Sequence, residues 1–138
     1  MAAKEMYDYL PTISPDVDVT LSIPCQVVLP EEGEFNQEIR KYDDGHVSVI
    51  SFSDVPEIHA ILQWPVENEA NTGTIIDIYY DTAKAFGMAN SFKWEHPSDG
   101  HTYVIAFRSK MRREILPAPD NYAIQAITVQ VLGKIADV

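Results

Sequence analysis

The chain has 138 residues, the length of one ordinary domain, and its 46% hydrophobic and 22% charged residues are typical of a globular protein. A single cysteine excludes an internal disulfide, and no apolar run approaches the ~18 residues of a membrane-spanning helix, so we expect no membrane partner. The formal net charge of −11 falls in residues 1–69, which hold 14 acidic and 3 basic side chains, and it argues against a specific nucleic-acid partner.

The N-terminal part of the chain predicts an arm followed by two strands. Pro11 and Pro15 interrupt residues 1–16, which we expect to form a flexible N-terminal arm. Apolar side chains then alternate with polar ones over residues 17–23 and again over 25–29, which is the period of a strand with one buried face. The acidic residues 30–34 are predicted as a turn.

A hairpin is predicted around Asp43-Asp44-Gly45, because Asp-Gly before a β-rich run favours a tight turn in which glycine takes a positive φ. Residues 46–52 form the second strand of this hairpin. Another strand follows Pro56, and the pattern puts four of its side chains on one face: Ile58, Ala60, Leu62 and Trp64.

Residues 72–87 change to the period of a helix. Apolar side chains recur at three- and four-residue spacing, namely Ile75, Ile76, Tyr79, Tyr80, Ala83 and Phe86. Thr72 or Asn71 can cap the start, and Gly87 is suited to end the helix in the left-handed conformation. Asp77 and Asp81 lie one helical turn apart on the polar side with Lys84, which indicates a solvated charged face.

The C-terminal half predicts three further strands. Residues 92–95 form a short strand, 97–100 a turn with proline and glycine, and 103–107 a second strand. After the proline-containing loop 117–121, a last strand covers 122–135. Because one helix cannot cover both faces of a sheet, we expect a single mostly-β (α+β) domain over residues 1–138: an antiparallel β-sandwich or partly closed barrel with one packed α-helix at about 72–87.

The sequence offers weak candidates for chemistry, and we predict no metal, no cofactor and no enzyme. Cys25 lies in an apolar run with no histidine or lysine within four residues, as is typical of a buried, inert thiol. His96 and His101 flank one turn near Asp99, but the tight paired spacing of a structural metal site is absent. Neither a glycine-rich phosphate loop nor a nucleophile elbow occurs.

One basic cluster lies between two predicted strands and is followed by an apolar pair. We take it as a candidate protein interface, formed by Arg108, Lys110, Arg112, Arg113, Ile115 and Leu116. The alternative is a solvated loop. As an interface it would contact the acidic half of another copy of the chain, and such head-to-tail contacts close into rings when the rotation permits.

Several short motifs from about Ile39 onward occur in the order found in a known family. They are Tyr42-Asp43-Asp44-Gly45, Ile61-Leu62-Gln63-Trp64, a helix closing at Phe86-Gly87, Ser91-Phe92-Lys93-Trp94, Pro97-Ser98-Asp99-Gly100, and Tyr103 to Phe107 before a terminal strand. This order resembles the minor tail proteins of long, flexible-tailed bacteriophages, most closely the lambda minor tail protein M group and more distantly the distal tail proteins. Residues 1–38 have no counterpart in it.

The resemblance implies a tail-tube-like fold, with two packed antiparallel sheets and a helix at one side. It further implies a structural protein of a phage or prophage tail that forms rings, commonly hexamers, between tail tube and tail tip. Its partners would be other copies of itself and neighbouring tail proteins, in the host cytoplasm during assembly and then in the virion tail. The alternatives are a small sandwich-type ligand-binding or enzymatic domain with a pocket near Trp94, His96 and His101, and a small adaptor.

Overall fold

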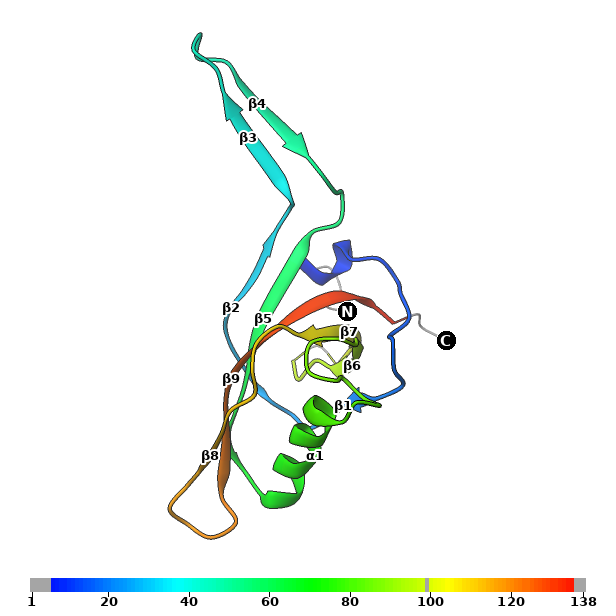
Figure 1. The fold of residues 1–138 in the computed structure, drawn as a ribbon, viewed down its shortest axis with the longest axis vertical. Helices are drawn as coiled ribbons and strands as arrows, with labels where there is room; N and C mark the ends of the chain where they lie inside the picture. The colour runs from blue at the N-terminus through cyan, green and yellow to red at the C-terminus, as the bar shows by residue number, and fades with distance from the viewer. Residues whose placement is uncertain (1–5, 99, 136–138) are drawn as a thin grey trace.

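The computed structural model describes residues 6–98 and 100–135, and most of the elements in this part of the chain are strands (Figure 1). In chain order they are the 3-10 helix η2 (Met6–Tyr9), β1 (Thr20–Leu21), β2 (Gln26–Glu34), β3 (Gln37–Lys41), β4 (Val47–Ser51), β5 (Glu57–Glu67), α1 (Glu69–Tyr80), β6 (Phe92–Glu95), β7 (Thr102–Phe107), β8 (Arg113–Ile115) and β9 (Tyr122–Lys134).

Seven of these strands form one curved sheet, and β3 and β4 form a separate hairpin. The order in the sheet is β1-β6-β7-β9-β5-β2, and β8 pairs with β9 beyond the end of β7. All named pairs are antiparallel except β1 with β6. The predicted mostly-β, sandwich-like α+β fold with one helix is therefore confirmed for the described residues, and the sheet does not close into a barrel.

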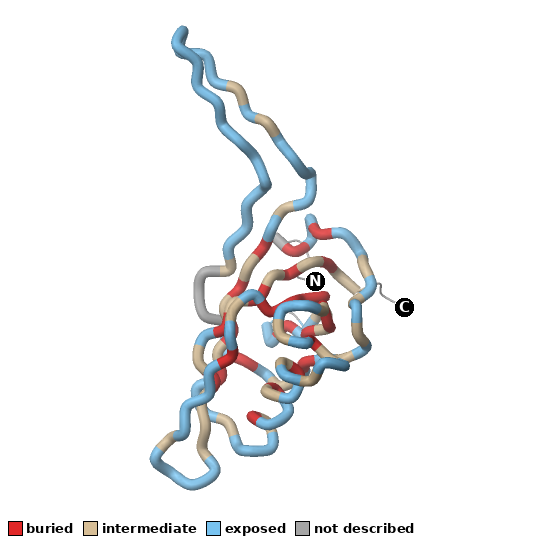
Figure 2. Tube along the Cα trace, in the orientation of Figure 1, coloured by how far each residue is buried: buried red, intermediate tan, exposed pale blue. Residues whose placement is uncertain are grey.

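The core lies where one face of this sheet meets α1 and the N-terminal segment. The predicted face of β5 is confirmed, because Ile58, Ala60, Leu62 and Trp64 are buried while the residues between them are only partly covered. β9 contributes buried residues in the same alternating way, and Ile75 and Ile78 of α1 pack into the same cluster. Each such aliphatic side chain contributes about 1.5–3 kcal/mol on burial. Figure 2 shows this buried centre in red.

The helix is shorter than predicted and begins earlier. It covers Glu69–Tyr80, so the predicted bounds 72–87 are wrong at both ends. Asn68 caps the start, because its side-chain oxygen accepts a hydrogen bond from the Asn71 N–H at 2.8 Å. After Tyr80 the chain forms successive turns, and Phe86 and Gly87 adopt positive φ values of 48° and 63°. The Gly87 N–H donates to the Tyr79 carbonyl at 2.7 Å, so the chain folds back on the end of the helix. The apolar spacing that predicted a longer helix therefore continues into these turns.

Residues 6–16 run along the body as a strap. Within it, Tyr7 and Leu10 are buried in the main core. The Ile13 N–H donates to the Lys134 carbonyl at 3.0 Å, and the Lys134 N–H donates to the Pro11 carbonyl at 2.9 Å. The part of the predicted arm that the structure describes is therefore packed against the end of β9. The first five residues of that arm, and Asp99 of the predicted turn, lie outside the described residues.

Candidate functional site

The hairpin β3–β4 projects from the body as a two-stranded ribbon (Figure 1). Its turn is the predicted one: Gly45 has a φ of 87°, its N–H donates to the Tyr42 carbonyl at 3.0 Å, and the Asp44 carboxylate accepts from the His46 N–H at 2.9 Å. The hairpin prediction is thus confirmed. A two-stranded hairpin is at best marginally stable in water unless something packs against it.

One face of the hairpin exposes three aliphatic side chains, with Gln37, Lys41 and Ser51 on the same face. Ile39 lies directly opposite Val49 in the register, and Val47 is the next residue on that face; their exposed fractions are 65%, 55% and 51%. The other face carries an ion pair between Arg40 and Glu38, with Nε 3.1 Å from Oε1. The hairpin therefore has the alternation of a strand pair with one buried face, although no described residue of this chain covers that face (Figure 2).

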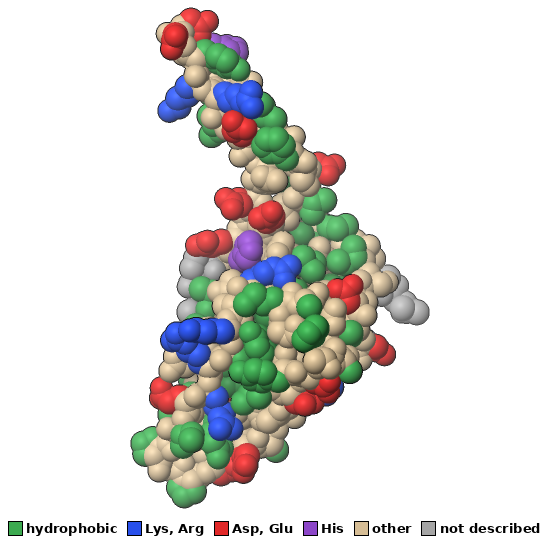
Figure 3. All heavy atoms as spheres, in the orientation of Figure 1, with side chains coloured by type: hydrophobic (Ala, Val, Ile, Leu, Met, Phe, Trp, Pro, Cys, Tyr) green, Lys and Arg blue, Asp and Glu red, His purple; other side chains and the backbone are tan. Residues whose placement is uncertain are grey.

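Acidic side chains gather where the hairpin leaves the body. In the β2–β5 register Glu34 lies directly opposite Glu57, and Glu32 lies opposite His59. Figure 3 shows acidic side chains in red around the foot of the hairpin, and both basic side chains in blue and acidic ones in red lower on the same view of the body. Like charges directly opposite each other destabilise a strand pair. The acidic residues at this end of the β2–β5 pair therefore lower the stability of the chain, and they attract cations.

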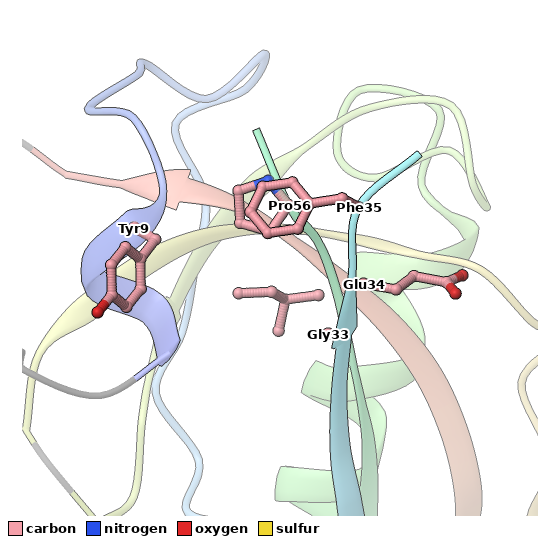
Figure 4. A pocket seen from close by; sticks show the side chains of 6 residues that line it. Tyr9, Gly33, Glu34, Phe35 and Pro56 are labelled. Carbon is pink, nitrogen blue, oxygen red and sulfur yellow. The ribbon is translucent and has the colours of Figure 1, made fainter. Parts of the chain in front are cut away.

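An apolar groove of about 250 Å³ lies between η2 and the foot of the hairpin. It is lined by Tyr9, Gly33, Glu34, Phe35, Pro56 and Ile58. In Figure 4 the rings of Tyr9, Phe35 and Pro56 surround the groove, and the Glu34 carboxylate points away from it. Tyr9 and Phe35 are 74% and 45% exposed. Phe35 also lines an adjoining hollow with Phe52 and Asp54, and the remaining lining residues of that hollow are polar: Gln37, Ser51 and Ser53.

The basic cluster predicted from the sequence separates into one anchored residue and an exposed group. Arg108 donates to the Gln130 side chain at 2.9 Å and to the Met88 carbonyl at 3.3 Å, so it joins β9 to the segment after α1. Lys110 and Arg112 are exposed on either side of Met111, which is buried. The structure therefore supports a structural role for Arg108 and leaves the other basic residues of the cluster at the surface.

Arg113 to Ile115 form strand β8, where the sequence predicted a loop. They pair with β9, which is long enough to extend past the end of β7. The Arg113 guanidinium lies 5.1 Å from the centre of the Tyr122 ring, and Tyr122 is the direct partner of Ile115. Ile115 is 72% exposed and Leu116 is half-buried. Arg113, Tyr122 and Ile115 thus form an ordered patch that combines a cation with an apolar side chain.

His96 is part of a buried aromatic cluster. Its ring packs against Tyr7, Trp94 and Tyr103, its Nδ1 accepts from the Ser98 N–H at 3.1 Å, and its Nε2 lies 3.5 Å from Oε1 of Glu31. The Tyr7 hydroxyl donates to the other oxygen of Glu31. The His96 hydrogen bond lowers the pKa of the Glu31 carboxyl, against the effect of burial. This cluster ties the strap, β2 and the β6–β7 turn together.

Two other sequence candidates have structural explanations. Cys25 is buried, and loss of solvent raises the pKa of its thiol to about 11. The Lys84 ammonium lies 2.6 Å from the Asp77 carboxylate, an exposed pair that raises the pKa of Lys84. Among the described residues, no three histidine, cysteine, aspartate or glutamate side chains are placed to hold a metal ion.

The sequence did not predict the apolar groove or the exposure of the hairpin. Tyr9 and Pro56 are 47 positions apart and meet only through the fold, so no local pattern signals the groove. The alternation in β4 was visible, but alternation indicates a buried face without saying what buries it.

The chain matches no protein-family model, and no curated protein sequence is measurably similar to it. None of the helices in the described ranges has the length and apolar character needed to cross a membrane. The class that the fold and the site define is a mostly-β α+β protein with a projecting hairpin that exposes three aliphatic side chains, and with charged surfaces at both ends.

Proposed function

We propose that this chain is a structural protein of a bacteriophage or prophage tail. It forms a ring, a hexamer in the simplest case, between the tail tube and the tail tip, and it acts by contacts with its own copies and with neighbouring tail proteins. It is not an enzyme and needs no cofactor. It occurs in the host cytoplasm during assembly and afterwards in the virion tail.

The observation that carries this proposal is the uncovered face of the β3–β4 hairpin. Ile39, Val47 and Val49 are exposed on a ribbon that needs packing to be stable. Contiguous exposed apolar surface marks a contact site in soluble proteins. The order of motifs that resembles phage minor tail proteins begins at this same hairpin, and a ring of identical subunits would supply the missing contact to every copy.

The test is the size of the protein in solution, measured by sedimentation velocity and light scattering over a wide range of concentration. We expect association that increases with concentration and closed rings in negative-stain electron microscopy. Ile39→Ser with Val49→Ser should weaken association about tenfold or more, while the helical and strand content is unchanged because both side chains are exposed. Met88→Ser is the control, since Met88 is 47% exposed in the segment after α1, outside the hairpin.

A protein that remains monomeric up to millimolar concentration, alone and with a phage tail extract, contradicts the proposal. The ligand-binding alternative predicts a different result. The 250 Å³ groove is smaller than the pockets that hold most drug-sized ligands. If the protein binds a small molecule instead, that compound should raise the unfolding midpoint of the monomer.

A further inference from the structure

Two surfaces at opposite ends of the molecule each combine exposed apolar side chains with charged ones, Glu34 and Asp54 at one end and Arg112 and Arg113 at the other. The apolar groove lies between η2 and the foot of the hairpin, and the β8–β9 end lies at the other end of the body (Figure 1). No lysine or arginine lines the groove, whereas Glu34 lines it and Asp54 lines the hollow that shares Phe35 with it.

The β8–β9 end carries side chains of both signs, with Arg112 and Arg113 beside Glu114 and Asp120, and its arginines are the groups that can meet the acidic foot of the hairpin. Ile115 is the most exposed aliphatic residue of this region at 72%, and Arg113 is held beside it on the Tyr122 ring. The connecting loop contains Pro117 and Pro119, and the Leu116 N–H donates to the Asn121 carbonyl at 3.0 Å, which keeps the loop short and ordered. A surface ordered in advance binds at a lower entropic cost.

We infer that the β8–β9 end of one copy docks into the groove of the next copy. Ile115 enters the apolar space beside Tyr9, Phe35 and Pro56, and Arg112 and Arg113 approach the acidic foot of the hairpin. The inference rests on the proposed self-assembly and names the two surfaces that meet. Because the surfaces differ and lie at opposite ends, the contact is head-to-tail, and it closes into a ring when the rotation between successive copies permits.

The groove has the size for this occupant. About 250 Å³ accommodates one or two aliphatic side chains and falls short of the volume of most drug-sized ligand sites. Oppositely charged flanks contribute chiefly to the rate and orientation of docking, and the apolar contact contributes chiefly to its lifetime. Association should therefore slow at high salt while the assembled state persists.

The test is a charge swap in the full-length protein, followed by sedimentation velocity. Glu34→Lys with Asp54→Lys makes the groove end basic, and Arg112→Glu with Arg113→Glu makes the loop end acidic. Each double variant alone should associate about tenfold or more weakly than the wild type, because like charges then meet. An equimolar mixture of the two should regain association, and so should the quadruple variant, since each contact again joins opposite charges.

Two variants complete the experiment. Ile115→Ser should weaken association without changing the unfolding midpoint, because its side chain is exposed. Asp18→Lys with Glu95→Lys is the charge-matched control, since both residues are exposed and lie outside the groove and the β8–β9 end, and it should assemble normally.

The outcomes separate this inference from the proposed function. If the wild type assembles and the hairpin variant Ile39→Ser/Val49→Ser disrupts it, but the swapped pairs neither weaken nor restore association, the docking assignment is wrong and the proposed function stands. If the wild type does not assemble at all, both are wrong. Restoration by the mixture and by the quadruple variant supports the assignment.

Discussion

Glu34 and Glu57 face each other directly across the β2–β5 strand pair, at the point where the hairpin leaves the body. Two carboxylates in that position repel each other, and neither has a basic side chain as its cross-strand partner. A monomer gains nothing from this arrangement. A partner that brought basic side chains to the same place would relieve the repulsion, as the proposed assembly requires.

Removing one of the two carboxylates should stabilise the monomer. Glu57→Gln is expected to raise the free energy of unfolding by roughly 0.2–1 kcal/mol, because it ends the like-charge contact with Glu34. Urea unfolding at low and high salt measures this, and the gain should shrink at high salt as the charges are screened. Glu95→Gln is the matched control, since Glu95 lies opposite Thr102 and should show no such gain. An equal effect of the two substitutions would contradict the explanation.

The sequence predicted those parts of the fold that local pattern determines. The alternation at Ile58 to Trp64 identified the buried face of β5, and Asp-Gly at 44–45 identified the hairpin turn. Both signals lie within a few residues, and the structure agrees with them. The helix was misplaced because its cap is Asn68, which is followed by Glu69 and Ala70 without a strong apolar pattern.

The candidate site was only partly predictable, because it depends on long-range pairing. The basic cluster was recognised, but Arg108 was not separable from Arg112 until the Gln130 contact was known. β8 was expected to be a loop, since three residues carry too little pattern to identify a strand, and only the length of β9 provides a partner for it. Tyr9 and Phe35 come together through the tertiary fold.

The stability of the protein should fall on acidification through Glu31. Folding lowers the pKa of this carboxyl below its usual 4.5, chiefly through the hydrogen bond from His96 and further through the Tyr7 hydroxyl. A group with a lowered pKa contributes stability that is fully present above its unfolded value and is lost as the pH falls through the folded value. Glu31→Gln should therefore destabilise the protein at neutral pH and approach the wild type below about pH 4.

The measurement for Glu31 is the unfolding midpoint between neutral and acid pH. Glu32→Gln removes a carboxylate from the next position of the same strand, where the facing residue is His59, and serves as the control. If Glu31→Gln and the wild type differ by the same amount at every pH, the interaction with His96 and Tyr7 is not electrostatic and the explanation fails.

Cys25 should be nearly unreactive in the folded protein. Burial raises the pKa of its thiol to about 11, so at pH 8 only about one molecule in a thousand carries the reactive thiolate. We expect a disulfide reagent such as Ellman's reagent to modify the native protein at least about a hundredfold more slowly than the urea-unfolded protein. Ser22→Cys in a Cys25→Ser background places a thiol at an exposed position three residues away and should react rapidly. Fast labelling of native Cys25 would show that the chain just before β2 opens readily.

The strap should be sensitive to a single methyl group at Gly133. A Cβ at this position would lie 2.7 Å from the Pro11 carbonyl oxygen and 2.6 Å from Cγ1 of Ile13, and the former is backbone that cannot rotate away. Gly133→Ala should therefore displace the strap, cost about 1–3 kcal/mol in unfolding free energy, and speed hydrogen exchange at the Ile13 and Lys134 amides. Gly73→Ala is the control: it sits on the exposed side of α1 with open space around it, so it should stabilise the protein by about 0.4–1 kcal/mol. If Gly133→Ala also stabilises the protein, Gly133 does not lie as close to Pro11 and Ile13 as these distances indicate.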